Sequence, residues 1–454
     1  MGEFEDQFED EVEDEDEGEV VIAPDSDEEE DEDEMELDNN DDEAEPADDL
    51  EVYLPGQKLA EDEELVADPS TYEMLHSMGV EWPCLSFDVL RDRLGTGRAT
   101  FPMTSYIVAG SQAEQAKDNK LYVMKMSQLH KTKVADDEDG EESGDDDLDD
   151  DPILEYKTVP HYGGVNRVRV MPHNEAHIVA SWADTGKVHI YDITEHVRAL
   201  DTPGLIPPRE PKPMYTIDNH GAYEGYAMDW SSLQTGHLVT GDTKGRIFLT
   251  QRTESAQFVT NKDYFRGHTD SVEDLQWCPT RTNVFASASV DQTIKIWDAR
   301  ERSKPQLSVH AHDSDVNVIS WHTTKDNLLA SGSDSGVFSI WDLRTWSVTA
   351  TPTPAATYKW HQDAITSIEW APHESSALAV AGADDQITLW DLSMEKDEDE
   401  APTIGASGVE VPPQLMFIHQ GQQHIKELHY HRQCPGVIIS TALNGFNVFK
   451  TINS

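Results

Sequence analysis

The 454-residue sequence predicts an all-β fold, a closed propeller of seven four-stranded blades, because one pattern recurs along its second half. Stretches that begin at Gly267, Ala311 and Trp360 each carry a histidine 29 residues before a tryptophan that is followed by aspartate. Each stretch divides into four short alternating strands with turn residues between them, over about 40 to 45 residues, which is typical of one propeller blade. Three matches at a fixed spacing predict a repeat architecture.

Four weaker units bring the count to seven blades. Copies begin at His161 and His220, and a C-terminal copy from His424 has Asn444 and Gly445 as its predicted two-residue hairpin turn. Four predicted strands of one further blade occupy residues 83–90, 104–112, 120–128 and 153–159. An unpaired edge where the ring closes would invite aggregation, so we expect a strand from residues 51–90 to pair with the last blade.

Acidic residues are concentrated in three segments, and they give the chain a formal net charge of −57. Residues 1–64, 136–151 and 395–400 hold 34, 12 and 5 of the 90 acidic residues. Segments this acidic cannot bury enough apolar area to offset the entropy of ordering, so we expect them to be disordered. The domain division that follows is a disordered acidic tail (1–65), an N-terminal helix (66–81) and the propeller (82–454), which includes the disordered acidic insertion (136–151) and an acidic loop (394–412).

A helix is predicted over residues 69–79, just before the ring. Asp68 can cap it, Pro69 suits its first position, and Gly79 suits its end. The apolar stripe of Met74, Leu75 and Met78 should pack against the rim of the propeller. Two interpretations stay open: the helix only covers a blade edge, or it also forms one wall of a binding groove.

The repeats resemble those of WD-repeat proteins over about residues 82 to 454. In that family a histidine, a strand hydroxyl, a turn aspartate and the tryptophan form a hydrogen-bonded network inside the blade. That resemblance assigns this network to His268, Ser287, Asp291 and Trp297. Two blades depart from the pattern, because residue 335 is serine where aspartate is expected and Val380 replaces the strand hydroxyl.

Two families of propeller chaperones are similar to this chain. The helix before Glu-Trp-Pro and the acidic "MEKDEDEAP" from Met394 resemble the histone-binding WD-repeat family of retinoblastoma-binding and chromatin-assembly proteins, in which a basic partner helix lies between these two pieces. The glutamate-rich N-terminus, "VYLPG", "CLSFDVLRD", "VPHYGGVNRVRV" and "CPGVIISTALNGF" more closely resemble the glutamate-rich WD-repeat family of ribosome-assembly factors. This second resemblance implies a dedicated chaperone of the third large-subunit ribosomal protein, in the nucleus and nucleolus with capture of the client in the cytoplasm, and histone binding is also attributed to the family.

The predicted partner-binding residues come from the helix and from the two acidic loops. The resemblance implies that the helix and the sixth-blade loop grip an ordered part of the client. The insertion should shield a basic extension of the client, since its twelve carboxylates are tethered at both ends to the ring. The residues are Tyr72, Leu75 and His76 in the helix, Glu395, Asp397, Glu398, Asp399 and Glu400 in the loop, and Asp145, Asp146, Asp147, Asp149, Asp150 and Asp151 in the insertion.

Other function classes are disfavoured. We expect no enzyme, catalytic residue or cofactor, since the histidines recur at the blade-start position, and no metal site, since His419, His424, His429, His431 and Cys434 lack tetrahedral spacing. A basic stripe for nucleic acid and an apolar run for a membrane are both missing from the sequence, and we expect a monomer without a signal peptide. Two Trp-Asp-x-Arg motifs, ending at Arg300 and Arg344, leave two alternatives beside the ribosomal chaperone: a histone chaperone, and a cullin-ligase substrate receptor that docks on the ligase adaptor.

Overall fold

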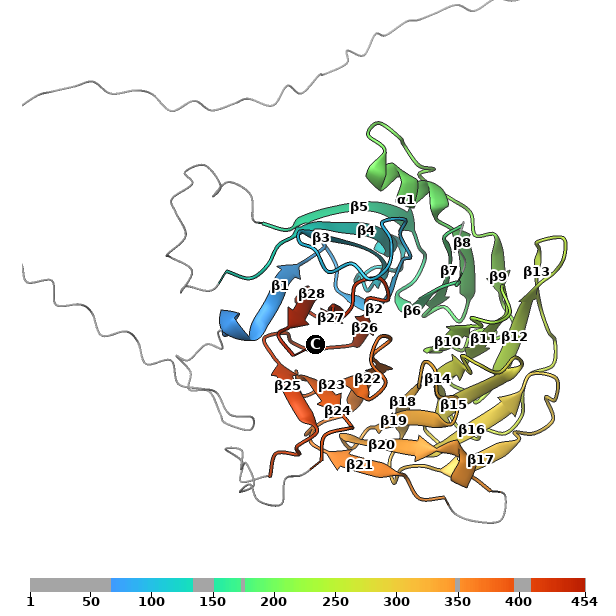
Figure 1. Ribbon diagram of the computed structural model, residues 1–454. Helices are drawn as coiled ribbons and strands as arrows, with labels where there is room; N and C mark the ends of the chain where they lie inside the picture. Colours follow the sequence, from blue (N-terminus) through green and yellow to red (C-terminus); the bar gives the residue numbers. More distant parts are fainter. Residues whose placement is uncertain (1–66, 134–150, 173–175, 348–351, 396–409, 454) are drawn as a thin grey trace, which may run out of the picture. The chain divides into compact units, whose positions relative to one another are not determined.

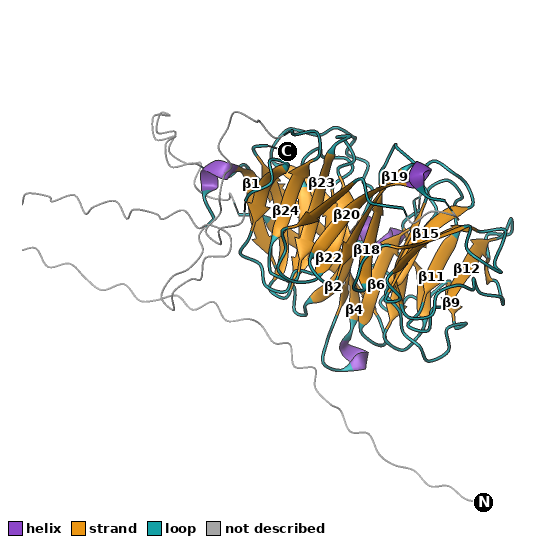
Figure 2. Cartoon of the chain, turned by 90° about the horizontal axis from the view of Figure 1, so that it is seen from below, coloured by secondary structure: helices purple, strands orange, loops and turns teal. Residues whose placement is uncertain are grey.

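The computed structural model describes residues 67–133, 151–172, 176–347, 352–395 and 410–453. These residues form seven antiparallel four-stranded sheets around a ring, so the predicted fold class is confirmed (Figure 1). The strands run between two faces, at which the connecting loops gather (Figure 2). In the described part of the chain, no helix is long and apolar enough to span a membrane.

Blades 1 to 6 each use four consecutive strands. Blades 1 to 3 contain β2 (Cys84–Val89), β3 (Met103–Ser111), β4 (Lys120–Leu129) and β5 (Ile153–Pro160), then β6 (Val165–Val170), β7 (Ile178–Ala183), β8 (Val188–Asp192) and β9 (Tyr215–Ile217), then β10 (Ala227–Trp230), β11 (Leu238–Gly241), β12 (Ile247–Arg252) and β13 (Phe258–Thr260). Blades 4 to 6 contain β14 (Val272–Trp277), β15 (Val284–Ser289), β16 (Thr293–Asp298) and β17 (Leu307–His310), then β18 (Val316–Trp321), β19 (Leu328–Ser333), β20 (Val337–Asp342) and β21 (Ala356–Lys359), then β22 (Ile365–Trp370), β23 (Ala377–Gly382), β24 (Ile387–Asp391) and β25 (Leu415–His419).

Blade 7 is built from both ends of the described chain. It joins β26 (Glu427–Tyr430), β27 (Ile438–Ala442) and β28 (Gly445–Thr451) to β1 (Tyr72–Met78), in the order β1-β28-β27-β26. The expected strand from residues 51–90 is therefore β1. The hairpin turn of this blade lies one residue earlier than predicted, since Ala442 pairs with Gly445 around Leu443 and Asn444.

The predicted N-terminal helix is wrong. Its start signals are used, because the Asp68 carboxylate accepts from the Ser70 N–H at 2.9 Å, but the resulting 3-10 turn η1 ends after Pro69–Thr71. The chain then becomes β1, whose backbone pairs with β28 from Tyr72 opposite Thr451 to Met78 opposite Phe446. Pairing the exposed edge of β28 outweighed the local helix signals, because an unpaired strand edge leaves a row of backbone groups unsatisfied.

The described helices are short and lie in loops. α1 (Thr194–Asp201) follows β8 and packs against β4 and β5 of blade 1, and the 3-10 turns η2 (Ala116–Asp118) and η4 (Leu343–Thr345) lie in other connections. The Asp201 carboxylate at the end of α1 accepts from the Tyr106 hydroxyl at 2.6 Å and pairs with Lys125 at 2.9 Å. These contacts fix α1 to one face of blade 1.

Neighbouring blades are joined around the channel by side chains of their inner strands. An oxygen on one inner strand accepts from a backbone N–H on the next, and the last such bond returns to blade 1. These pairs are Asp88 with Val170 (2.7 Å), Asp229 with Trp277 (2.7 Å), Asp274 with Ile319 (2.9 Å), Ser367 with Leu428 (3.2 Å) and Glu427 with Phe87 (2.9 Å). Each bond satisfies a buried polar group, so the ladder helps to fix the blade order around the ring.

Candidate partner-binding site

The acidic insertion of blade 1 leaves the ring beside β1. The Thr132 N–H donates to the Glu73 carbonyl at 3.1 Å, and Nε2 of His76 donates to the His130 carbonyl at 2.9 Å. Lys131 adds an ion pair to the Glu73 carboxylate at 3.4 Å. The stem of the insertion, residues 129–133, is therefore attached to the outer strand of blade 7.

His76 serves this attachment. Burial lowers its pKa, so the imidazole is neutral near neutral pH and keeps a donor for the His130 carbonyl. Its half-buried ring leaves little surface for a partner. The structure thus gives this predicted binding residue a positioning role at the base of the insertion.

Tyr72 and Leu75 contribute to packing between blades 6 and 7. The Tyr72 side chain is buried, and its ring lies edge-on to Phe417 of β25 at 5.2 Å. Leu75 is half-buried against the same apolar cluster. Both side chains are committed to the interior of the ring, so the wall of a groove that the predicted helix would have formed is absent.

The predicted acidic residues lie mainly outside the described residues. Asp397, Glu398, Asp399, Glu400, Asp145, Asp146, Asp147, Asp149 and Asp150 belong to this undescribed set. Glu395 and Asp151 are described and exposed, the first after β24 in blade 6 and the second just before β5 in blade 1. The two acidic segments thus connect strands of blades 6 and 1, on either side of blade 7.

Exposed apolar side chains occur on the same three blades, and sequence patterns did not single them out. Met416 on β25 is 37% exposed, and Ile452 after β28 is 62% exposed. Ile153 and Tyr156 on β5 are each 47% exposed. Alternation could have indicated them, because outward positions of an outer strand that carry apolar residues break the usual polar pattern.

The four-residue network inside blade 4 has the predicted geometry. Nδ1 of His268 lies 2.8 Å from the Asp291 carboxylate, and its Nε2 lies 2.6 Å from the Ser287 hydroxyl. The Trp297 indole donates to that hydroxyl at 2.8 Å. These residues form a structural support within the blade and are buried from partners.

The two irregular blades keep this network by different routes. In blade 5 the His312 imidazole and the Trp341 indole still meet at the Ser331 hydroxyl, at 2.7 and 2.8 Å. In blade 6 the hydroxyl comes from Thr388 on the next strand, 2.9 Å from Nε2 of His361 and 2.7 Å from the Trp390 indole. The Val380 departure therefore moves the hydroxyl to another strand without removing it.

The C-terminal histidines have separate partners. His419 contacts Tyr72, His429 pairs with Glu369 at 2.7 Å, and His431 lies in a turn where its ring accepts from the Gln433 N–H. Among the described residues, no group of three or more histidine, cysteine or acidic side chains could hold a metal ion. Cys84, Cys278 and Cys434 are buried free thiols.

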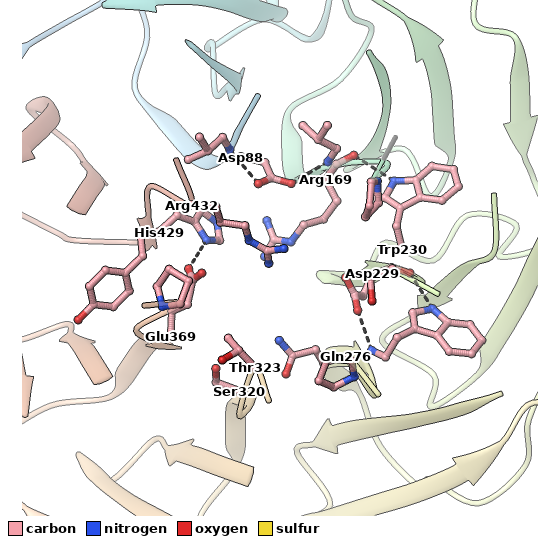
Figure 3. Close-up of a pocket in the computed structure, with 18 of the residues that line it drawn as sticks. Asp88, Arg169, Asp229, Trp230, Gln276, Ser320, Thr323, Glu369, His429 and Arg432 are labelled. Atoms are coloured by element: carbon pink, nitrogen blue, oxygen red, sulfur yellow. Dashed lines mark hydrogen bonds and ion pairs between the residues drawn. The ribbon is translucent and has the colours of Figure 1, made fainter. Parts of the chain in front are cut away.

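A central channel with buried charges is a feature that the sequence did not reveal. The cavity has a volume of about 1150 Å³ and is lined by the inner strands of all seven blades (Figure 3). In its wall the Glu427 carboxylate pairs with Arg167 at 2.7 Å and Arg169 at 2.6 Å. These residues come from blades 7 and 2, so only the closed ring brings them together.

His429 extends this buried cluster toward blade 6. Burial alone would lower the pKa of His429, but Glu369 and Glu427 together raise it to about 10. Burial would likewise raise the pKa of Glu427, yet Arg169 and Arg167 hold it well below the ordinary range. The cluster is therefore ionised at neutral pH, and we assign it to ring closure, since buried pairs of this kind depend on all their partners.

The two Trp-Asp-x-Arg arginines have partners inside their own motifs. Arg300 pairs with Asp298 and Arg344 with Asp342, with 74% of each arginine side chain exposed. Each aspartate also accepts from the backbone N–H of its arginine at 3.0 Å. Docking on a ligase adaptor stays a prediction, because this local pairing accounts for the geometry by itself.

The repeats, the in-blade networks and the closed ring define the chain as a WD-repeat propeller protein. A model of the WD domain, G-beta repeat, matches residues 260–298, 303–342 and 352–391. A second model, which describes the histone-binding protein RBBP4 and its counterpart in the CAF1 complex, matches residues 62–130. The WD40 β-propeller domain of Doa1 is similar in fold, with a TM-score of 0.54 and 15% identity over 84% of this chain and 96% of that chain.

Curated relatives narrow the class to one family. The chain is 52% identical over 409 residues to the ribosome assembly protein rrb1 of Schizosaccharomyces pombe, covering 88% of this chain and 84% of that protein. It is 45% identical over 411 residues to the glutamate-rich WD repeat-containing protein 1 of Dictyostelium discoideum, covering 87% and 83%. The chain belongs to the glutamate-rich WD-repeat family. A probable histone-binding protein of Caenorhabditis elegans, rba-1, is 30% identical over 254 residues, or 53% of this chain and 58% of that protein.

Proposed function

We propose that this protein is a ribosome-biogenesis factor, an acidic WD-repeat chaperone without catalytic activity. It binds a newly made basic ribosomal protein of the large subunit, shields it, and delivers it to pre-ribosome assembly. The observation that carries this proposal is the 52% identity over 409 residues to a ribosome assembly protein. The client proposed is the third large-subunit ribosomal protein, and the sites of action are the nucleus and nucleolus, with cytoplasmic capture of the client.

The charge of the chain supports the shielding of a cation. A formal net charge of −57 gives a basic client many exchangeable contacts that compete with nucleic acid for its charges. The stem attached to β1 through Glu73 and His76 holds one end of the twelve-acid insertion at the rim of the ring. Tethering at a fixed place raises the local concentration of carboxylates beside a docked client.

Salt dependence of binding tests this proposal. We expect the affinity of the full chain for the third large-subunit ribosomal protein to fall steeply with added salt and to reach a plateau. Screening beyond a Debye length of about 8 Å at physiological ionic strength removes the polyanionic contribution, whereas contacts with buried apolar area persist. Titration calorimetry from low to high salt measures this. Loss of all binding at moderate salt would show a purely electrostatic association and would contradict the proposal of a folded binding surface.

Histone binding is the second candidate function. It is favoured by the match of residues 62–130 to the histone-binding family model and by the similarity to the C. elegans relative. The same titration with a histone H3–H4 pair distinguishes the two candidates. Tighter binding of the histone pair than of the ribosomal protein, retained at high salt, would make histones the primary client.

A further inference from the structure

The outer strand of blade 1 is longer than the outer strands of blades 2 to 6. β5 has eight residues, whereas β9 and β13 have three, β17 and β21 have four, and β25 has five. Short outer strands limit the number of unpaired backbone groups that a sheet exposes, which protects a propeller from unwanted strand pairing. β5 lacks this protection.

The register of blade 1 identifies the unpaired groups. The His161 N–H donates to the Asn119 carbonyl at 2.9 Å, and the ladder continues without a shift from Lys120 opposite Pro160 to Ser127 opposite Ile153. Because bonded and non-bonded pairs alternate in an antiparallel ladder, every second residue of β5 points its N–H and C=O away from β4. These residues are Leu154, Tyr156 and Thr158, followed by Pro160, which has no N–H to offer.

The outward edge is accessible over its first half. Ile153 and Tyr156 are each 47% exposed, and Glu155 between them is also exposed. In the part of the chain that the structure describes, no backbone bond reaches the outward groups of β5. Figure 1 shows β5 as the outermost strand of its blade. α1 does not bond to this edge, since its described bonds to blade 1 go from Asp201 to side chains of β3 and β4.

Charge indicates what kind of segment would pair with this edge. The twelve carboxylates of residues 136–151 directly precede β5 in the chain, and exposed Glu155 lies within the strand. An added strand with basic residues would therefore meet complementary charge, while Tyr156 offers an apolar contact for one face of it. Recognition by strand addition takes its affinity from main-chain bonds and its selectivity from alternate side chains.

We infer that the outer edge of β5 binds an extended basic segment of the client as a fifth strand of blade 1. The segment bonds to the outward N–H and C=O groups of Leu154, Tyr156 and Thr158 and packs against the Tyr156 ring. This inference rests on the proposed function, because it assumes a basic client. It adds the place and the backbone geometry of one contact.

Three substitutions in the full chain test the inference. Thr158→Pro and Tyr156→Pro each remove an outward N–H without removing a bond to β4, and we expect each to weaken binding of the third large-subunit ribosomal protein at least about tenfold. Tyr156→Lys keeps the backbone intact and adds like charge at the edge, so it should also weaken binding. The matched control is Ser308→Pro in β17, where the Ala311 N–H to Gln292 bond places residue 308 at an outward position of a four-residue strand. The control should bind like wild type.

Hydrogen exchange of the unmodified chain provides a measurement that does not depend on how the variants fold. The amides of residues 154, 156 and 158 should exchange quickly in the free chain and become protected when the client is added. Protection in the free chain would mean that the edge is already covered by this chain or by a second copy, and would overturn the inference. Unchanged affinity of all three β5 variants would also overturn it while leaving the proposed function intact, whereas failure of the wild-type chain to bind the client would refute the proposed function itself.

Discussion

The Tyr72 hydroxyl of β1 and Nδ1 of His419 in β25 are 2.8 Å apart and join blade 7 to blade 6. The Asn447 amide donates to Nε2 of the same ring at 3.1 Å, so the proton of the neutral imidazole is on Nδ1 and is donated to Tyr72. Burial lowers the pKa of His419 to about 3, which keeps the ring neutral. The two residues at the ends of this bond are 347 positions apart, so it is made only when the ring closes.

Tyr72→Phe should destabilise the propeller by about 1 to 3 kcal/mol, because it leaves the buried Nδ1–H of His419 without a partner. Urea denaturation measures the free energy of unfolding. Client affinity of the folded variant should not change, since the Tyr72 side chain is buried. A variant of normal stability but weakened client affinity would return Tyr72 to the role of a contact residue and contradict this assignment.

Thr388→Val should destabilise the protein by about 2 to 4 kcal/mol, because one hydroxyl serves both His361 and the Trp390 indole. Adding Val380→Thr to that variant should recover part of the loss, since position 380 is where the other blades carry the hydroxyl. A thermodynamic cycle of the two substitutions measures the coupling. Simple additivity of the two changes would show that the strand position of the hydroxyl is not interchangeable.

His429 should make stability fall as the pH rises above neutral. Its pKa is raised from 6.5 to about 10 in the folded protein, so its contribution is complete below about pH 6.5 and is lost as the pH rises through 10. The slope from this one group is at most about 1.4 kcal/mol per pH unit. Chemical denaturation at pH 7, 8 and 9 should show a steeper decline for wild type than for His429→Gln. Parallel pH profiles for the two proteins would exclude the charged imidazole.

Replacing the twelve acids of residues 136–151 by serine and glycine should lower client affinity and let RNA remove the client, because the tethered carboxylates would no longer compete with phosphate. Stability should be nearly unchanged, since the bonds of the stem to Glu73 and His76 are retained. RNA competition against a preformed complex with the third large-subunit ribosomal protein measures the effect. If the neutralised chain protects the client as well as wild type does, the insertion is only a spacer.

Removal of residues 1–50 should leave a folded propeller, because all seven described blades are built from residues 72–451. Differential scanning calorimetry of the truncated and full-length proteins makes the comparison. We expect a shift in midpoint of only a few degrees. A decrease of about ten degrees or more would show that the tail contributes to the folded ring.

The sequence by itself determined the repeat, the blade count and the network of His268, Ser287, Asp291 and Trp297. These follow from local periodicity and turn chemistry, which recur in each blade and so can be recognised without knowing the ring. The sequence also required a strand from residues 51–90 to close the last blade. That requirement was correct, although the same residues carried helix start signals around Asp68 and Pro69.

Only the tertiary structure decided which signal prevailed in residues 72–78 and which charged residues meet. The edge of β28 supplies backbone partners that no local pattern contains, so β1 is a strand and Tyr72 faces blade 6. Glu427 meets Arg167 and Arg169 because the ring brings together residues about 260 positions apart in the chain. Contacts of this kind depend on closure of the whole fold, because the free energy of pairing one strand edge or one buried charge is realised only after all seven blades are in place.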